Sequence, residues 1–407
     1  MIKDAIIVIP FHVPWIWHAD YPTQTALVLK KHNTVVCFLW REALSLKECL
    51  LQQKLPKIIT KPSVNLYFYT PLHFLPFRRF RLVQIVNLVL NILLLKGWLW
   101  RREKKFGPKK KILWLFGLFD SSFFILPSKF FPKYLILYDC VDYAWHPDKK
   151  ARKQIQLQER KLLQFAHIVI VHSLALYRLY QRDRADIHYV PIGFNGYVYT
   201  RKQIKRVILL PAIRPIIGFI GAIGYRLDFA LLTQLAARNP QWLFALVGPI
   251  ETEGYDEMLK NKVQKLIHEE NVMRFFIKKK QNLPGVIKQF DIGMIPYDVS
   301  LPFNKYCNPL KLYEYFYMGK PVIATPIAEL RQFSDYVKLG KTVSEWEHHI
   351  KTLLSQPWPK AKQQRIIALA HSWEKRIAII SEIIVENKYV SAPSEALLPQ
   401  DGRKANK

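Results

Sequence analysis

Short apolar runs alternate with amphipathic segments along most of this chain, and the alternation occurs twice. In the first half, six apolar runs lie at residues 4–10, 34–39, 64–69, 111–116, 134–139 and 167–172. A helical pattern at residues 149–165 separates two of them. Runs of this length, bounded by proline or polar residues, are typical of strands buried on both faces of a parallel sheet. The sequence therefore predicts a doubly wound α/β architecture.

The same pattern starts again after residue 206, with apolar runs at 216–221, 242–248, 291–297 and 321–326 and helical patterns at 228–239, 256–271 and 308–319. A chain of 407 residues is also too long for one ordinary core. Proline, glycine and basic residues between Pro191 and Arg206 indicate the linker. We therefore expect a first domain at residues 1–200 and a second at 201–372, followed by a closing helix at 373–390 and a mobile tail at 391–407.

Composition excludes some classes of protein. Half of the residues are hydrophobic, so the chain is not disordered. Its four cysteines are far apart, which argues against a zinc ribbon or a disulfide framework. The first apolar run meets Pro10 and lacks a cleavage site, so we expect a strand in a cytoplasmic protein and not a secretory signal. The net charge of +30 suits nucleic acid, an anionic membrane or phosphorylated ligands, and charge alone does not choose among them.

One segment, from Leu82 to Trp100, is nearly long enough to span a bilayer. Gln84, Asn87 and Asn91 fall on one helical face, which indicates an amphipathic helix and argues against spanning. Basic residues flank both ends, so positive-inside asymmetry is lacking. Two interpretations stay open. The helix lies in an anionic membrane surface, peripheral on the inner face of the plasma membrane, or it is a buried helix with a solvated charged collar.

The segment from residue 297 to residue 326 carries the most specific chemistry. Asn308 and Pro309 are favoured at the start of a helix, where free backbone N–H groups attract an anion. Lys311 adds a positive charge in the first turn, and Glu314 lies one turn further on the same face. A cation followed by a carboxylate suits a nucleotide diphosphate and its ribose hydroxyls. The alternative is an ordinary Lys–Glu pair on a helix surface.

These residues carry a family resemblance. Asn308 to Tyr315, followed by Met318 to Thr325, resembles the donor-site helix and next strand of GT-B glycosyltransferases. The group that it resembles is the family-4-like "group 1" of bacterial cell-surface polysaccharide synthesis, including teichuronic-acid-type enzymes. Weaker resemblance extends over most of the chain, at residues 138–143, 166–173, 190–193, 217–221 and 371–374.

The resemblance implies two Rossmann-like domains facing a cleft. Lys311 would contact the donor diphosphate and Glu314 the ribose, while Gly221 to Gly224 would let the backbone approach the phosphates. Arg226 is then either a second phosphate cation or an ordinary solvated arginine. The implied activity is hexosyl transfer from a nucleotide-diphosphate sugar to a lipid-linked or polysaccharide acceptor, with retention, in cell-surface glycan synthesis. The sugar nucleotide is a co-substrate, so we expect no cofactor.

On the acceptor side the candidate catalytic residues are Asp142 and His18, each placed after an apolar run, where ligands of such sheets bind. Asp142 could accept a hydroxyl proton or cap a turn, and His18 could act as a base or be an ordinary loop histidine. His146 is a weaker candidate. Many relatives carry a glutamate eight positions before the one that corresponds to Glu314, and here that position is Tyr306.

Other classes of function fit less well. Residues 218–224 contain GxxGxxG but not the GxGxxG of dinucleotide-binding oxidoreductases. The sequence has no D-x-D motif, so we expect no metal site and a metal-independent reaction in which cationic side chains hold the diphosphate. No RNA-binding motif accompanies the basic charge, so nucleic acid is not an expected partner. Because of Tyr306, the alternative is a catalytically inactive GT-B protein that binds a sugar nucleotide or a glycan.

Overall fold

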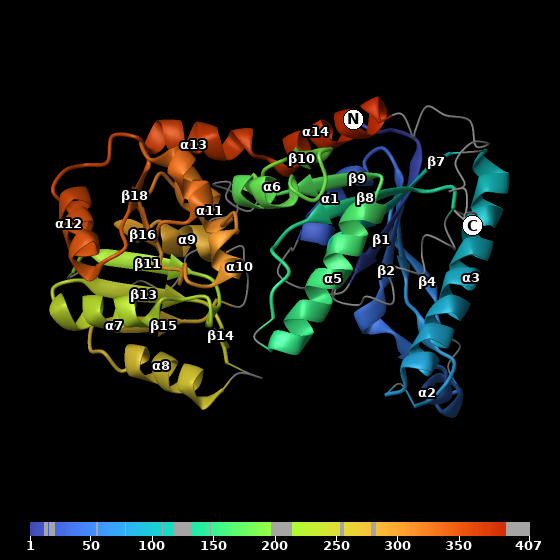
Figure 1. Cartoon of the computed structure of the whole chain (residues 1–407), viewed down its shortest axis with the longest axis horizontal. Coiled ribbons are helices and arrows are strands. Elements are labelled where there is room, and N and C mark those ends of the chain that lie inside the picture. Colours follow the sequence, from blue (N-terminus) through green and yellow to red (C-terminus); the bar gives the residue numbers. More distant parts are fainter. Residues whose placement is uncertain are drawn as a thin grey trace, which may run out of the picture.

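The computed structural model describes residues 1–11, 15, 21–53, 56–77, 79–107, 109–117, 132–146, 148–196, 214–252, 256–277 and 282–387. Over these residues the chain forms two α/β units that lie side by side, each built around one central sheet (Figure 1). The expected α/β class with parallel sheets is therefore confirmed.

The first unit has a sheet in the order β10-β9-β8-β7-β1-β2-β5-β4, in which only β4 and β5 pair antiparallel. A short pair, β3 with β6, lies beside it. The strands are β1 (Ala5–Phe11), β2 (Thr34–Leu39), β3 (Leu44–Ser45), β4 (Ile59–Ser63), β5 (Leu66–Tyr69), β6 (Leu72–His73), β7 (Lys110–Leu115), β8 (Leu135–Cys140), β9 (Ile168–Val171) and β10 (Ile187–Tyr189). The helices are α1 (Tyr21–Leu29), α2 (Leu46–Leu51), α3 (Arg81–Phe106), α5 (Lys149–Phe165) and α6 (Leu174–Tyr180), with a 3-10 turn η1 at Trp40–Glu42.

The second unit has an all-parallel sheet in the order β15-β13-β11-β16-β17-β18, and β12 pairs with β14 nearby. Its strands are β11 (Ile216–Ile220), β12 (Ile223–Gly224), β13 (Leu243–Val247), β14 (Ile250–Glu251), β15 (Val272–Phe275), β16 (Ile292–Ile295), β17 (Val322–Ala324) and β18 (Val337–Leu339). Its helices are α7 (Phe229–Arg238), α8 (Glu257–Ile267), α9 (Leu283–Ile287), α10 (Pro302–Lys305), α11 (Lys311–Tyr317), α12 (Val343–Leu354) and α13 (Ala361–Ala370), with η5 at Ala328–Phe333.

Local sequence explains where several helices begin. Asp148, Asp228 and Asp256 each accept a hydrogen bond from the backbone N–H three residues on, at 2.8, 2.9 and 3.0 Å. Such N-caps satisfy a donor that the helix itself leaves unpaired. Several of the strands between them, such as Leu243–Val247, are completely buried. Buried strands and capped helices together produce the two layered units.

The last helix, α14 (Trp373–Glu386), returns from the second unit to the first (Figure 1). Trp373, Ile377 and Ile380 pack in the core that β1 and α1 also line. Gly193 allows this crossing, because a Cβ there would lie 2.4 Å from the Trp373 ring. The expected boundary near residue 200 and the expected tail at 391–407 both lie outside the described residues.

One local expectation is wrong. The helix expected from Asn308 spans only Lys311–Tyr317, and Leu310 stands at its cap position without a side-chain cap bond. The amide of Asn308 instead donates to the carbonyl of His172 in the first unit, at 3.0 Å. Asn87 and Asn91, whose direction the sequence left open, are buried on the inner side of α3. In both cases the asparagine side chain pairs with backbone groups of another segment.

Candidate functional site: an opening at the edge of the second sheet and the cleft beside it

An opening of about 270 Å³ lies where β11, β13 and α11 meet. Its floor is the backbone just after two neighbouring strands, at Gly221 and Gly248. Lys311 and Glu314 from α11 line one wall, and Phe276 and Leu283 add apolar surface. The opening thus lies at the carboxyl edge of a parallel sheet, where such folds bind ligands.

The floor requires glycine. Gly221 has a φ of +129°, and a Cβ on it would lie 2.6 Å from both Cε and Nζ of Lys311. A Cβ on Gly248 would lie 2.0 Å from the Gly221 carbonyl oxygen. The two glycines therefore let the turn backbones touch and let the Lys311 ammonium lie against them. Gly248 was not a candidate from the sequence, although it directly follows a buried strand as Gly221 does.

Lys311 keeps its positive charge available. Its Nζ donates to the Tyr297 hydroxyl at 2.7 Å and lies 5.2 Å from the centroid of the Phe219 ring. A phenol and an aromatic ring orient an ammonium group without neutralising it. Glu314 lines the same opening and is only 5% exposed, so an exposed surface pair of Lys311 and Glu314 is ruled out.

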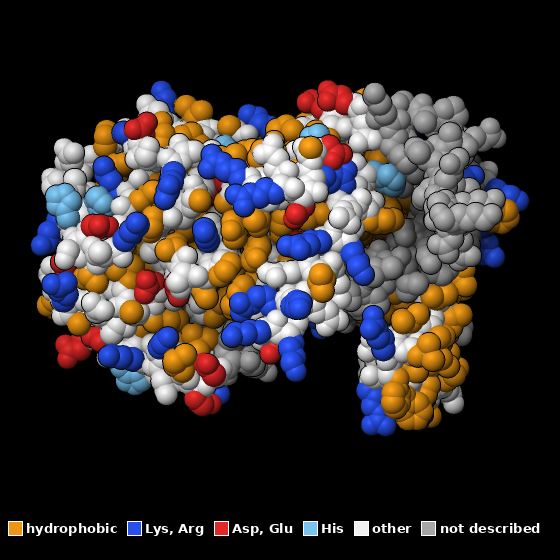
Figure 2. Space-filling model, in the orientation of Figure 1, with side chains coloured by type: hydrophobic (Ala, Val, Ile, Leu, Met, Phe, Trp, Pro, Cys, Tyr) orange, Lys and Arg blue, Asp and Glu red, His pale blue; other side chains and the backbone are white. Residues whose placement is uncertain are grey.

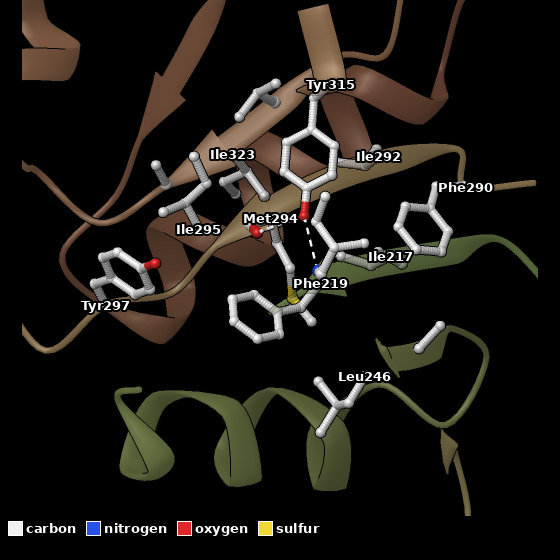
Figure 3. Packing of buried hydrophobic residues seen from close by; sticks show 14 of the residues in the cluster. Ile217, Phe219, Leu246, Phe290, Ile292, Met294, Ile295, Tyr297, Tyr315 and Ile323 are labelled. Carbon is white, nitrogen blue, oxygen red and sulfur yellow. Dashed lines mark hydrogen bonds between the residues drawn. The ribbon is translucent and has the colours of Figure 1, made fainter. Parts of the chain in front are cut away.

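Tyr315 fixes α11 against the sheet. Its hydroxyl accepts a hydrogen bond from the Ile220 N–H at 3.1 Å and lies 3.2 Å from the carbonyl oxygens of Gly218 and Met294. Figure 3 shows this side chain reaching from the helix to the strands, beside Met294 and Phe219. Tyr315 therefore sets the position of Lys311 and Glu314, which lie on the same short helix. In the sequence, the only signal for this role of Tyr315 is its place in an aromatic-rich segment, residues 313–317.

Arg226 and Gly224 lie outside the lining of this opening. Gly224 lets two backbones approach, since a Cβ there would lie 2.7 Å from the Glu251 carbonyl oxygen. Arg226 is half-buried, not solvated, and its Nε donates to Asn304 Oδ1 at 2.9 Å. Its guanidinium carbon lies 4.4 Å from the Tyr297 ring centroid and 4.5 Å from that of Phe303.

Asp142 follows β8 of the first unit and interacts electrostatically with Arg226. Burial raises the pKa of the Asp142 carboxyl, while Arg226 and His172 oppose the rise. Burial also disfavours the charge of Arg226, but Tyr297, Cys307 and Asp142 outweigh it, so the pKa of Arg226 is raised. Candidates from the two halves of the sequence therefore lie close enough to interact where the two units meet.

Aromatic pairs also cross the cleft. Trp145 after β8 stacks on Tyr225 at 5.7 Å between ring centroids, with 8° between the planes. The Tyr143 and Tyr306 ring centroids lie 4.9 Å apart, which places Tyr306 in the interface between the two units. His146 instead accepts the Asp148 N–H at 3.0 Å in the turn before α5. His18 lies outside the described residues.

A buried network joins the two units behind the cleft. Asp139 Oδ1 lies 2.7 Å from His172 Nε2 and 2.6 Å from Arg376 Nη2, and Oδ2 accepts from Trp114 at 3.0 Å. Burial works against ionising Asp139, but Arg376 and His172 outweigh it and lower its pKa to about 2. Ser173, the residue after His172, donates through its Oγ to the Tyr306 carbonyl at 2.5 Å. This bond and the one from Asn308 to His172 hold the segment before α11 against the loop after β9.

Within the described residues, no group of three or more His, Cys, Asp or Glu side chains is placed to hold a metal ion. The groups at the opening that suit an anion are the Lys311 ammonium and the backbone of the two glycine turns.

The arrangement matches known structures over nearly the whole chain. Sucrose-phosphate synthase from Thermosynechococcus elongatus superposes with a TM-score of 0.70 at 16% identity, covering 96% of this chain and 100% of that one. Anabaena Alr3699/HepE in complex with UDP and glucose gives 0.63 at 12% identity, covering 93% and 99%. The α,α-trehalose-phosphate synthase (UDP-forming) from Burkholderia vietnamiensis gives 0.63 at 11% identity, covering 96% and 99%.

The chain has the GT-B fold. A curated relative adds sequence similarity to this likeness. TuaH of Bacillus subtilis (strain 168), assigned to teichuronic acid biosynthesis as a glycosyltransferase, is 29% identical over 204 residues. The match covers 47% of this chain and spans about half of the relative, 50% of its length. The expected resemblance to GT-B glycosyltransferases is thus confirmed. No family model matches the chain.

Proposed function

We propose that this GT-B protein is a glycosyltransferase whose donor substrate is a nucleotide-diphosphate sugar. The single observation that carries the proposal is the opening where the Lys311 ammonium lies against the Gly221 turn and Glu314 lines the same wall. An available cation and free backbone suit a diphosphate, and a buried carboxylate suits vicinal ribose hydroxyls. Sugar nucleotides of uridine are the first candidates, because structures with this fold hold UDP or UDP-2-fluoro glucose.

The proposed reaction breaks the bond between the anomeric carbon and the diphosphate oxygen. It forms a bond from that carbon to an acceptor oxygen on the same face of the sugar ring, so the anomeric configuration is retained. Lys311 would stabilise the charge that develops on the leaving diphosphate. Asp142 would accept the hydroxyl proton, since burial raises its pKa and makes its carboxylate a stronger base. Arg226, facing Asp142, would hold a phosphate or the carboxylate in place. These groups would make the transfer independent of a metal ion.

The acceptor, the outcome at the anomeric carbon and the location are finer parts of the same proposal. We propose a lipid-linked or polysaccharide acceptor on the cytoplasmic side, with hexosyl transfer and retention, in synthesis of a cell-surface glycan. The assignment of TuaH to teichuronic acid biosynthesis supports the acceptor class. Proton NMR of the product anomer tests retention.

Donor binding is tested by thermal shift with UDP-, GDP-, ADP-, CMP- and dTDP-sugars. A ligand that binds only the folded state raises Tm, by an amount that grows with concentration over Kd. We expect one nucleotide class to stabilise the wild type, and Lys311→Ala and Glu314→Ala to lose at least about tenfold in affinity. Lys351→Ala, an exposed lysine on α12, is the matched control. Equal shifts for all three variants would refute the assignment of the site.

Turnover separates the enzyme from the alternative. Asp142→Asn should bind the donor as the wild type does but lose transfer to lipid-linked acceptors from cell extracts. If the wild type binds a sugar nucleotide and transfers nothing to any such acceptor, the chain is a GT-B binding protein, as the tyrosine at position 306 already allows.

A further inference from the structure

A surface helix usually turns its apolar side to the protein and its polar side to solvent, but α3 has buried asparagines on its inner side and exposed apolar residues on its outer side. Two of its polar side chains, Asn87 and Asn91, face the protein. Asn91 pairs with both backbone groups of Leu72, at 2.8 Å each. Asn87 pairs with both backbone groups of Leu75, at 2.9 and 3.2 Å. The two asparagine amides thus form the hydrogen bonds that a neighbouring strand would otherwise form with the backbone of Leu72 and Leu75, which lies beside the helix.

The opposite side of α3 is apolar and open to solvent. Leu82, Leu90, Leu93 and Trp100, with spacings of eight, three and seven residues, are 73%, 38%, 50% and 55% exposed. Just before the helix, Phe77 and Phe80 are 67% and 52% exposed. We call these six side chains the outer face of α3. Figure 2 shows hydrophobic side chains gathered where α3 begins, at the lower right, with Lys and Arg beside them. Large contiguous patches of this kind mark interaction sites.

Cations frame the outer face at both ends and interrupt it once. Arg79, Arg81, Lys96, Arg101 and Lys104 are all exposed. Lys104 Nζ lies 4.1 Å from the Trp100 ring centroid, and the Arg79 guanidinium lies 4.9 Å from that of Phe80. Glu103 is the single acidic residue between Arg79 and Gly107, and it pairs with Lys111 at 2.6 Å. The surface is therefore apolar at its centre and cationic at its rim, with aromatic rings beside the cations.

Among the described residues, α3 is the one helix long and apolar enough to cross a membrane by length and composition. Its inner side argues against crossing. Leu88, Ile92 and Leu95 belong to the core of the first unit, and the asparagine bonds would be lost in lipid. A second copy of the chain fits poorly as the occupant, because two such basic faces repel each other.

We propose that the outer face of α3 docks on the surface of an anionic lipid bilayer, with the helix axis in the plane of the membrane. Leucine and aromatic side chains would enter the boundary between headgroups and acyl chains, and the flanking cations would contact anionic headgroups. The helix lies at the end of the first unit far from the second unit, so docking leaves the donor opening clear (Figure 1). The inference stands apart from transferase activity, since it rests on exposure and charge alone.

Flotation of the whole protein with lipid vesicles tests the proposal. We expect the wild type to float with phosphatidylcholine vesicles that contain phosphatidylglycerol, and to bind pure phosphatidylcholine less. Binding should weaken as salt rises, because the cations are exposed. The double variant Leu82→Glu/Leu93→Glu should bind about tenfold or more weakly. The matched control is Leu157→Glu/Ile366→Glu, whose leucine and isoleucine are 51% and 59% exposed on α5 and α13.

Three outcomes would overturn the proposal. One is a wild type that stays unbound with anionic vesicles at low salt. Another is equal binding by the two double variants, with circular dichroism showing both folded. The third is resistance of vesicle-bound protein to alkaline carbonate, which would indicate spanning. Sedimentation velocity tests the competing occupant, a second copy of the chain. If the wild type is a dimer that does not bind vesicles, and Leu82→Glu/Leu93→Glu dissociates it, the outer face of α3 is a contact between copies.

Discussion

Single residues set the geometry of the opening beside Lys311, the proposed donor site. Gly221 has a positive φ and no Cβ, and the Lys311 ammonium occupies the space that a Cβ would take. Tyr297 then holds Nζ from the other side at 2.7 Å. The chemistry proposed for Lys311 therefore depends on two neighbours that carry no charge.

Gly221→Ala tests this dependence. The new methyl group would meet Lys311 Cε and Nζ, and alanine is strained at this φ, so we expect a loss of about 1–2 kcal/mol in unfolding free energy. Donor affinity should fall about tenfold as the ammonium is displaced. Gly97→Ala is the control, because nothing lies within 4 Å of a Cβ there and alanine favours a helix, so Tm should hold or rise. Calorimetry and nucleotide titration measure both effects, and an unchanged affinity for Gly221→Ala would separate the glycine from the site.

At the scale of elements, α3 shows how a helix can complete a sheet edge. The segment after β5 pairs with β3 through β6, and the Asn91 and Asn87 amides bond the backbone groups of Leu72 and Leu75. The Tyr69 hydroxyl also lies 3.0 Å from the Asn91 carbonyl oxygen. The two asparagines therefore lie on the inner side of the helix with Leu88, Ile92 and Leu95, while Leu82, Leu90, Leu93 and Trp100 face outward.

Asn91→Leu should destabilise the first unit. The substitution leaves the Leu72 N–H and C=O buried without their partners, at a cost of about 1–3 kcal/mol for each group. Lys96→Leu, at an exposed position of the same helix, should change the unfolding free energy by less than about 0.5 kcal/mol. Urea unfolding with a probe in the first unit compares them. Equal midpoints for the two variants would contradict the role given to Asn91.

At the scale of the whole molecule, the buried Asp139, His172 and Arg376 network joins α14 to the end of β8. The carboxylate is fully buried, and its three partners come from β7, the loop after β9 and α14. Glu329 adds a second link, accepting from the Leu174 N–H and the Tyr189 hydroxyl at 2.7 Å each. The cleft is thus held by charges that solvent does not reach.

Arg376→Met should be the costliest of these substitutions. It leaves the Asp139 carboxylate buried without its cation, which typically costs about 3–5 kcal/mol. Adding Asp139→Asn removes the stranded charge and should restore part of that loss. In the wild type the stability from Asp139 is present above its ordinary pKa and is lost as pH falls toward about 2, because its folded pKa is lowered. Thermal melts from pH 7 to pH 3 should show this acid loss in the wild type and not in the double variant.

The sequence by itself determined the two α/β halves, the strands that carry the site and the pair Lys311 and Glu314. Each of these features follows from a local pattern, either an apolar run or a spacing along one helix, and the tertiary structure keeps that pattern. The closing helix is found at Trp373–Glu386, close to the expected start. The antiparallel β4 was missed, because Ile59–Ser63 is half-polar and includes a proline, which suits an edge strand.

Only the tertiary structure decided which residues face one another. The positions of Gly248, Tyr297 and Tyr315 around Lys311 depend on strand order, which spacing in a single sequence does not encode. The direction of Asn308, Asn87 and Asn91 was decided by unpaired backbone groups elsewhere in the chain. A helical pattern fixes which residues share a face but not which way the face points. That choice depends on where the buried donors and acceptors of distant segments find partners.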